Sequence, residues 1–246
     1  MSGTVASGTR RAVGKHEFAK CIDHTLLKPY ATGADIDRLC AEAMKFDFWS
    51  VCVGSFYVKR AAENLRGSGV KVCAVVGFPL GFSSTSVKLA EAETAIGDGA
   101  DEIDMVMNLG AFKSGDYNFI FHEIEDAAKC CHGARKLLKV IIECCYLTND
   151  EKVGAARLAE RAGADYVKTS TGFGTSGATV EDVALLKKAL AGTARIKAAG
   201  GIGTLEKALE MIKAGADRIG TSSSVKIMEE WKETADRGLK VAPRSG

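Results

Sequence analysis

The 246-residue sequence predicts a single-domain (β/α)8 barrel of the TIM-barrel class, and three observations support this prediction. Eight short apolar runs alternate with helix-like segments from residue 20 onward. The strand starts recur about every 28 residues, a spacing that fits one βα unit. A length near 250 residues is common for one domain of this class. An open, doubly wound parallel sheet is the second architecture that fits the same alternation.

The predicted strands are short runs rich in apolar and β-branched residues. They cover residues 21–25, 49–53, 70–78, 102–108, 138–144, 166–170, 195–199 and 218–222. Several of these runs are almost continuously apolar, which is typical of a parallel sheet that helices cover. Their even spacing, with no long insertion, favours a closed barrel over an open sheet.

The predicted helices lie between these strands and carry clear start and stop signals. They cover residues 35–46, 87–96, 119–131, 149–162, 180–190 and 205–213. Thr148, Thr179 and Thr204 each stand directly before a helical segment, where a threonine side chain can cap the first backbone N–H groups. Glycines close several segments, as expected at helix ends.

Composition and charge exclude several classes of protein. Apolar residues make up 46% of the chain and charged residues 26%, with a net charge of +2, so the chain is neither disordered nor strongly basic. The longest strongly apolar stretch, residues 140–147, contains Glu143 and falls far short of the ~20 residues that span a membrane. We therefore expect a soluble, cytoplasmic protein with neither a nucleic acid nor a membrane as partner.

The ends of the chain and its cysteines predict no further site. Residues 1–14 are rich in Ser, Gly and Thr, so we expect a disordered tail before a barrel domain at 15–246. The eight cysteines include no C-x-x-C spacing, and two of their pairs are adjacent in sequence. Structural zinc sites normally have ligands two to four residues apart, so we expect neither metal nor cofactor.

An internal repeat places charged residues on a common face. Gly-Ala-Asp begins three segments, 99–104, 163–168 and 215–220, each reading helix end, turn and strand. Because alternate strands of a barrel contribute to one interior layer, the last residues of these segments are expected to share a layer. These residues are Asp104, Lys168 and Gly220.

Two lysines and this aspartate suggest carbonyl chemistry. Lys168 and Lys197 both lie late in apolar strands, at the end where barrel enzymes keep their active sites. An exposed, helix-facing position is the competing interpretation of each lysine. A neutral lysine amine can attack a carbonyl to form a Schiff base, and burial or a neighbouring ammonium favours the neutral form. Asp104 can move protons during these steps, directly or through water.

Glycine and hydroxyl residues follow the last three predicted strands, at residues 169–172, 200–201 and 220–223. Exposed backbone N–H groups and hydroxyls at this end of a barrel form a phosphate cradle, although tight turns favour the same residues. Residues 172–177 also match the dinucleotide pattern G-x-G-x-x-G. That site needs an acidic residue about 20 positions later, where Arg195 and Lys197 stand instead, so no NAD site is predicted.

The first strand offers a further pair of polar residues. Asp23 and Thr25 share one face, and His24 lies on the other. If the first face is interior, Asp23 and Thr25 join the pocket, and His24 is a structural residue outside the barrel.

Taken together, these residues resemble the deoxyribose-phosphate aldolase family. The motifs that carry the resemblance span residues 22 to 224 in the family's order, and KTSTGF with a downstream K-x-x-GG is highly specific to it. The motifs are IDHTLL (22–27), VCV (51–53), EIDMVMN (102–108), LLKVIIE (137–143), YVKTSTGF (166–173), IKAAGGI (196–202) and GTSSS (220–224).

The resemblance implies a class I aldolase of nucleoside catabolism. Such an enzyme reversibly cleaves 2-deoxy-D-ribose 5-phosphate to D-glyceraldehyde 3-phosphate and acetaldehyde. It also implies that Lys168 is the Schiff-base nucleophile, Lys197 the lysine that tunes it, and Asp104 the proton-relay acid. The implied substrate contacts are Asp23, Thr25, Cys52, Thr171, Gly172, Gly200, Gly201, Gly220, Ser222 and Ser223.

The chain departs from the family's pattern in two places. Gly203 stands where the family usually has an arginine, which removes a cation near the expected phosphate loop. Residues 1–14 have no counterpart in the family and carry no predicted site residue.

Two other interpretations remain open from sequence. One is another lysine-dependent barrel, such as a transaldolase or a keto-acid aldolase. The other is a non-catalytic barrel that binds sugar phosphates. We expect small-molecule sugar phosphates and aldehydes as partners, and a homo-oligomer, either a dimer or a tetramer.

Overall fold

The structure is a computed structural model that describes residues 14–236. The predicted tail at 1–14 lies outside the described residues, apart from Gly14, which precedes the first helix.

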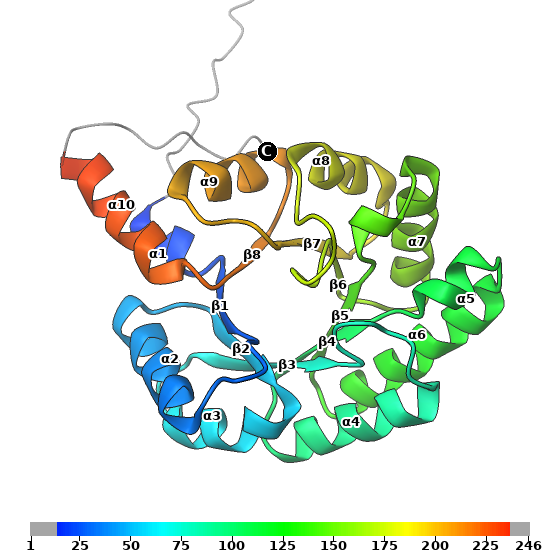
Figure 1. Cartoon of the computed structure of the whole chain (residues 1–246), viewed down its shortest axis with the longest axis horizontal. Coiled ribbons are helices and arrows are strands. Elements are labelled where there is room, and N and C mark those ends of the chain that lie inside the picture. Colours follow the sequence, from blue (N-terminus) through cyan, green and yellow to red (C-terminus); the bar gives the residue numbers. More distant parts are fainter. Residues whose placement is uncertain (1–13, 237–246) are drawn as a thin grey trace, which may run out of the picture.

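Eight parallel strands close into a barrel in chain order, so the predicted (β/α)8 architecture is confirmed (Figure 1). β8 pairs with β1 and completes the ring. The strands are β1 (Ile22–Leu26), β2 (Ser50–Gly54), β3 (Lys71–Val76), β4 (Glu102–Val106), β5 (Leu137–Ile141), β6 (Tyr166–Lys168), β7 (Arg195–Ala199) and β8 (Arg218–Thr221).

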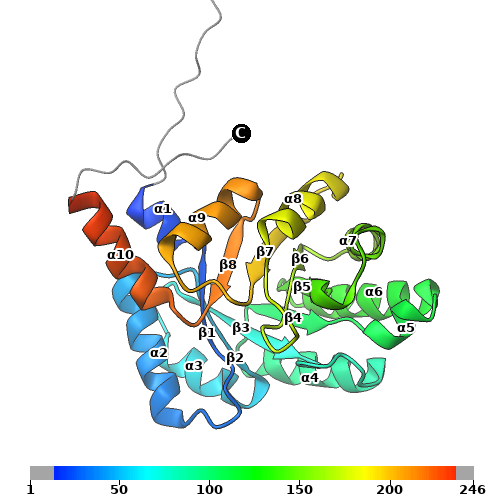
Figure 2. The ribbon, with the colours of Figure 1, turned by 45° about the horizontal axis from the view of Figure 1, so that its top comes forward.

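Helices surround the ring of strands on its outer side (Figure 2). They are α1 (Lys15–Ala19), α2 (Gly33–Phe46), α3 (Val58–Asn64), α4 (Thr85–Gly97), α5 (Leu109–Lys113), α6 (Tyr117–Gly133), α7 (Asn149–Arg161), α8 (Val180–Ala189), α9 (Leu205–Ala214) and α10 (Ser224–Asp236). Two short 3-10 helices, η1 (Ser55–Tyr57) and η2 (Cys144–Tyr146), follow β2 and β5. Within residues 14–236, each helix is either too short or too polar to span a bilayer.

Helix starts follow the predicted threonine caps. The Thr148 hydroxyl accepts a hydrogen bond from the Glu151 N–H at 3.3 Å. Thr179 and Thr204 cap α8 and α9 in the same way. Each cap satisfies a backbone donor that the helix itself leaves without a partner.

Four predicted strands extend at least two residues too far at their carboxyl ends. The runs at 70–78, 102–108, 138–144 and 166–170 end as strands at Val76, Val106, Ile141 and Lys168. Apolar residues continue beyond the assigned strand ends because the βα loops at this end are themselves buried; Met107 and Ile142 are examples. Both still donate a backbone hydrogen bond to the next strand, Met107 to the Ile141 carbonyl and Ile142 to the Lys168 carbonyl, so burial and continued pairing together account for the longer apolar pattern.

The two faces of each strand differ in chemistry. Residues such as Val51, Ile103 and Val140 alternate along the strands and pack against the helices in the main hydrophobic core. The interior of the barrel carries most of the buried charge, with only a small apolar cluster formed by Cys52, Cys73 and Val75. A polar interior is costly unless every group is paired, so the interior indicates function.

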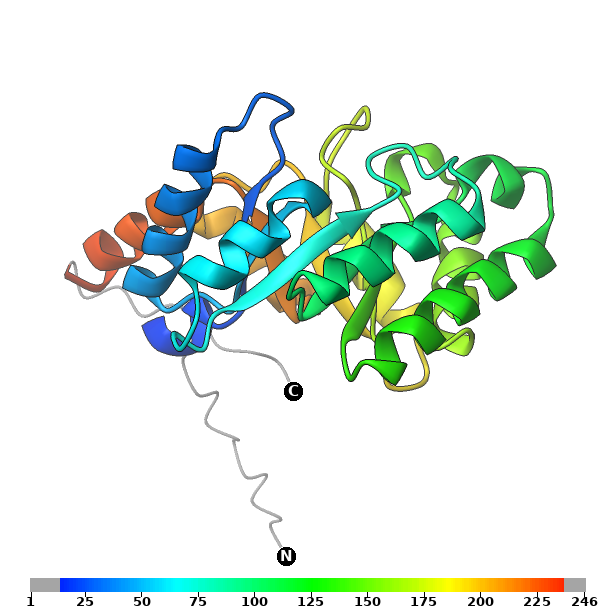
Figure 3. The ribbon, with the colours of Figure 1, turned by 90° about the horizontal axis from the view of Figure 1, so that it is seen from below.

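The two ends of the barrel are also distinct. The loops after β1 and β6 project from one end, and α1 lies near the other (Figure 3). Phe18 of α1 stacks on Trp231 of α10 with ring centroids 4.8 Å apart. The end with the projecting loops is the carboxyl end of the strands, where barrel enzymes bind substrate.

Candidate active site

The barrel interior holds a cluster of seven charged side chains, none of them more than 3% exposed. They come from six strands and face one another across the barrel. They are Asp23, Glu102, Asp104, Lys139, Lys168, Lys197 and Arg218. Residues of these types are almost never fully buried unless they are paired.

Asp104 on β4 is the centre of this cluster. Its Oδ2 atom accepts hydrogen bonds from the Nζ atoms of Lys168 at 2.8 Å and Lys197 at 2.6 Å. Its Oδ1 atom accepts one from the Nζ atom of Lys139 at 2.8 Å. One carboxylate therefore serves three ammonium groups, and each ammonium is only partly neutralised by it.

Opposing effects act on the pKa of Asp104. Burial raises the pKa, but the ammonium groups of Lys139, Lys168 and Lys197 outweigh burial and hold it well below its ordinary value. Asp104 is thus ionised at neutral pH and acts mainly as a hydrogen-bond acceptor.

A second layer of ion pairs lies next to the first. Lys197 also contacts the Asp23 carboxylate at 2.6 Å, and Lys139 contacts the Glu102 carboxylate at 2.6 Å. Arg218 pairs with both of these acids. Burial lowers the pKa values of Lys139 and Lys197, but their carboxylate partners outweigh it and raise both above the ordinary lysine value.

The seven charges do not balance. Three lysines and one arginine face three carboxylates, so loss of one proton from one lysine makes the set neutral. Of these four cations, only Lys168 lines the pocket at the end of the barrel. Lys168 is therefore the lysine of the cluster that a bound molecule can reach.

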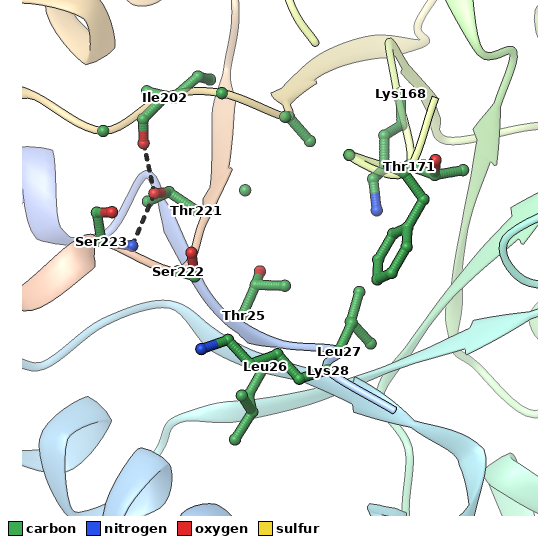
Figure 4. Close-up of a pocket in the computed structure, with 17 residues that line it drawn as sticks. Thr25, Leu26, Leu27, Lys28, Lys168, Thr171, Ile202, Thr221, Ser222 and Ser223 are labelled. Atoms are coloured by element: carbon green, nitrogen blue, oxygen red, sulfur yellow. Dashed lines mark hydrogen bonds between the residues drawn. The ribbon is translucent and has the colours of Figure 1, made fainter. Parts of the chain in front are cut away.

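The pocket above Lys168 has a volume of about 360 Å³. Figure 4 shows the Lys168 ammonium pointing into it, with Thr171 beside it and Ser222 and Ser223 on the opposite side. No Asp or Glu lines this pocket. The space is polar at both sides and is suited to an anionic ligand that extends from Lys168 to the serines.

Glycines shape the wall of the pocket that is formed by the loop after β7. Gly200 and Gly201 adopt positive φ angles of 89° and 69°, which disfavour other residues. Gly220 serves a different purpose, because a β-carbon there would lie 3.0 Å from the Cε atom of Lys197. The absence of a side chain at position 220 therefore makes room for Lys197.

The structure places the predicted site residues at two depths. Thr25, Lys168, Thr171, Gly172, Gly200, Gly201, Gly220, Ser222 and Ser223 line the pocket. Asp104, Lys197, Asp23 and Cys52 are fully buried and are not among the lining residues. The last two, expected as substrate contacts, thus lie within the barrel interior.

Cys52 forms a pair with a cysteine that the sequence did not single out. Cys73 is its neighbour in the ladder between β2 and β3. The hydrogen bond with Cys73 and the Lys197 ammonium both lower the pKa of the Cys52 thiol, whereas burial raises it. The net effect is a pKa of about 7 for Cys52. The Lys139 ammonium lies 3.4 Å from the Cys73 sulfur.

These two thiols and Asp104 are the one set of metal-ligand types that lies close together in residues 14–236, with ligand atoms within 4.8 Å. Three ammonium groups already contact Asp104. A cation placed there would face their repulsion, so the set fits a metal ion poorly.

Sequence reasoning missed four charged residues of the site: Glu102, Lys139, Glu143 and Arg218. A usable signal existed for two of them, because Glu102 shares its strand face with Asp104, and Arg218 shares its face with Gly220. Lys139 is fully buried within the apolar run at 137–141.

Glu143 has a distinct role at the end of β5. Its backbone adopts a positive φ of 49°, which is uncommon outside glycine. Its carboxylate accepts hydrogen bonds from the backbone N–H of Thr171, at 3.2 Å, and from the Thr171 hydroxyl. Glu143 therefore anchors the loop that follows Lys168.

His24 lies outside the barrel interior. Its ring nitrogens contact the Ser224 hydroxyl at 3.0 Å and the Glu42 carboxylate at 2.8 Å, and its ring packs near Phe48. The residue links β1 to α2 and α10, as a structural histidine does.

Comparison with known proteins places this site in a family. Residues 18–230 match the model of the DeoC/LacD family aldolases. The chain is 56% identical to the deoxyribose-phosphate aldolase of Thermococcus gammatolerans over 215 residues, 87% of this chain and 96% of the relative. It is also 56% identical to that of Brevibacillus brevis, with the same coverage.

A solved structure gives the same result. The tetrameric deoxyribose phosphate aldolase from Aeropyrum pernix superposes with a TM-score of 0.83 at 35% identity, covering 89% of this chain and 92% of that one.

Proposed function

Because the chain belongs to the DeoC/LacD family of aldolases, we propose that the protein acts on 2-deoxy-D-ribose 5-phosphate through a Schiff base formed by Lys168. The reaction is the reversible carbon–carbon cleavage of this sugar to D-glyceraldehyde 3-phosphate and acetaldehyde. The observation that carries the assignment is that Lys168 alone among the interior cations lines the pocket.

The first step is attack of the neutral Lys168 amine on C1 of the open-chain sugar. The nitrogen forms a bond to C1, and the carbonyl oxygen takes up a proton to give a carbinolamine. Loss of water then leaves a protonated Schiff base. Its positive charge replaces that of the ammonium at nearly the same place, so the ion pair with Asp104 is kept.

Cleavage follows from the electron demand of the Schiff base. The C3 hydroxyl loses its proton, the C2–C3 bond breaks, and its electron pair moves toward the nitrogen to give an enamine. Glyceraldehyde 3-phosphate leaves with C3. Protonation of the enamine at C2 and addition of water to C1 release acetaldehyde and restore the lysine.

Asp104 and Lys197 support these steps from beneath the pocket. Both Lys168 and Lys197 donate to the same Oδ2 atom, so Asp104 provides a route for a proton between the two nitrogens. Lys139, on the other oxygen, keeps Asp104 ionised and fixed in orientation. Asp23 in turn holds Lys197.

The opposite side of the pocket suits the phosphate of the substrate. The serine hydroxyls and the glycine loop provide donors, and the lining contains no carboxylate that would repel an anion. Ser223 lies directly before α10, whose positive end also favours negative charge.

We further propose that the protein forms a homo-oligomer, as the Aeropyrum pernix relative does. Several large apolar side chains are more than half exposed in the segments that follow the first three strands. They are Tyr30, Phe56, Leu80 and Phe82. Exposed apolar residues of this kind gather at protein interfaces. Light scattering coupled to gel filtration gives the stoichiometry, and a monomer at micromolar concentration would contradict the proposal.

A coupled assay tests the activity. The purified protein should release glyceraldehyde 3-phosphate from 2-deoxyribose 5-phosphate, and Lys168→Met should not, because it lacks the nucleophile. Lys113→Met, in an exposed ion pair with Glu151, is the matched control and should retain turnover. An inactive native protein, or an active Lys168→Met variant, would refute the proposal.

A further inference from the structure

The pocket lacks a dedicated cation at its phosphate side. Two charged residues line it, Lys28 and Lys168, and Lys168 belongs to the interior ion-pair cluster. A sugar phosphate carries up to two negative charges, and serine hydroxyls and backbone N–H groups satisfy them only in part. Recognition of such a group normally includes a charged partner.

Lys207 lies next to this side of the pocket. It is in the first turn of α9, directly beyond the glycine loop that follows β7. Its Nζ atom lies 3.6 Å from the position that a β-carbon would take at Gly201. Gly201 lines the pocket. Because it has no side chain, residue 201 does not separate the Lys207 ammonium from the pocket.

The Lys207 ammonium is also available for a ligand. Within residues 14–236, no carboxylate lies within ion-pair distance of it. The lysine in the first turn of the next helix, Lys226, differs, because Glu230 contacts its ammonium at 3.7 Å. Lys207 is half-buried, so its side chain already has limited rotamer freedom. A contact with phosphate would therefore cost less conformational entropy than it would for an exposed lysine.

We propose that Lys207 is the residue that selects phosphorylated over unphosphorylated substrate, by placing its ammonium against the phosphate above Gly201. This inference rests on the function proposed above. Lys28 is the less suitable cation, because it is exposed on the loop after β1 and its ammonium lies 5.8 Å from the Tyr30 ring centroid.

The test compares kcat and KM for 2-deoxyribose 5-phosphate and for 2-deoxyribose. Lys207→Met should raise KM for the phosphorylated sugar about tenfold, the usual size of one charge-assisted contact, with kcat within about twofold. Kinetics with unphosphorylated 2-deoxyribose should not change. Lys213→Met, an exposed lysine at the other end of α9, is the matched control and should behave like the native protein.

A second variant restores the charge from a different position. At Gly203 the nearest neighbour of a β-carbon would be the Ser223 hydroxyl at 4.0 Å, so a side chain fits there. Gly203→Arg in the Lys207→Met background should bring KM for the phosphorylated sugar back toward the native value. A purely structural role of Lys207 would not be rescued in this way.

Three results would overturn the inference. They are an unchanged KM for the phosphorylated sugar in Lys207→Met, an equal rise for both sugars, and a selective loss in Lys28→Met instead. In this experiment, native protein that cleaves neither sugar would refute the proposed function, and would also remove the basis for the role of Lys207. Native cleavage of both sugars, with no selective effect of Lys207→Met, refutes the inference alone.

Discussion

Lys139 is a residue of the interior ion-pair cluster that the structure reveals and the sequence did not predict. It is fully buried, and it joins Asp104 at 2.8 Å to Glu102 at 2.6 Å. Lys139→Met keeps the length of the side chain but leaves both carboxylates with one cation fewer. Removing one partner of a buried pair costs about 3–5 kcal/mol of unfolding free energy.

Urea unfolding measures this cost. Turnover should also fall, because the pKa of Asp104 moves back toward its ordinary value and its Oδ1 atom loses its partner. Lys113→Met, in an exposed pair with Glu151, is the control and should leave stability almost unchanged. If the two variants are equally stable, the interior ion pairs do not have the role described.

Lys197 is predicted to support turnover through Asp104. Lys197→Leu removes one of the two ammonium groups that donate to the Asp104 Oδ2 atom, and with it the proton route between the two nitrogens. Because general acid–base assistance typically contributes 10²-fold or more, kcat for 2-deoxyribose 5-phosphate should fall by about 10²-fold. Steady-state kinetics measure this, and a kcat close to the native value would argue against a shared role of the two lysines.

At the scale of single elements, the helix caps make the most direct prediction. The Thr148 hydroxyl caps α7 by accepting from the Glu151 N–H, and the Thr148 N–H in turn donates to the Glu151 carboxylate at 2.7 Å. Thr148→Ala should cost about 1 kcal/mol and lower Tm by about 2–4 °C.

Thr94→Ala is the matched control for this cap. Thr94 lies within α4 and its hydroxyl only donates back to the Ala90 carbonyl, so its removal should have little effect on Tm. Equal losses in the two variants would mean that the cap is not the source of the stability.

The helices and strands also show how much of the fold could be predicted from the sequence. Apolar periodicity and threonine caps predicted six helices to within two residues at each end. The short helices α3 and α5 were not predicted, because seven and five residues are too few to display a full amphipathic repeat. The barrel closure was predicted from strand spacing, and the β1–β8 pairing confirms it.

The site residues likewise fall into those that the sequence predicted and those that it did not. Asp104, Lys168 and Lys197 stand out in sequence as charges late in apolar strands, and the structure brings them together, while their roles stay proposals. Lys139 was not predicted, because it lies in the middle of an apolar run. Which face of the barrel its side chain occupies becomes clear only from the pairing of β5 with β4, where Lys139 lies beside Asp104. Arg218 shares its strand face with Gly220, but it begins its strand, where a charged residue usually meets solvent, and the closed barrel shows it to be buried.

For the whole molecule, the buried charges predict how stability depends on pH. Burial raises the pKa of Asp23, but Arg218 and Lys197 outweigh it, so the folded value lies below the ordinary one, as for Asp104. A lowered carboxyl pKa stabilises the fold above the unfolded value near 3.9, and this contribution is lost as pH falls further.

The raised pKa values of Lys139 and Lys197 act at the other extreme. Their contribution is complete below the unfolded lysine value near 10.4 and is lost as pH rises through the folded values. Tm should therefore be nearly constant between about pH 5 and 9 and fall on both sides. A Tm that stays constant down to pH 3 would contradict the ion-pair assignment.

Borohydride trapping identifies the nucleophile, which we propose to be Lys168. The protein is incubated with acetaldehyde, reduced with borohydride and digested, and the modified lysine is located by mass spectrometry. We expect one two-carbon adduct on Lys168, absent from Lys168→Met and still detectable in Lys197→Leu. An adduct on Lys197 or Lys139 that persists in Lys168→Met would contradict it.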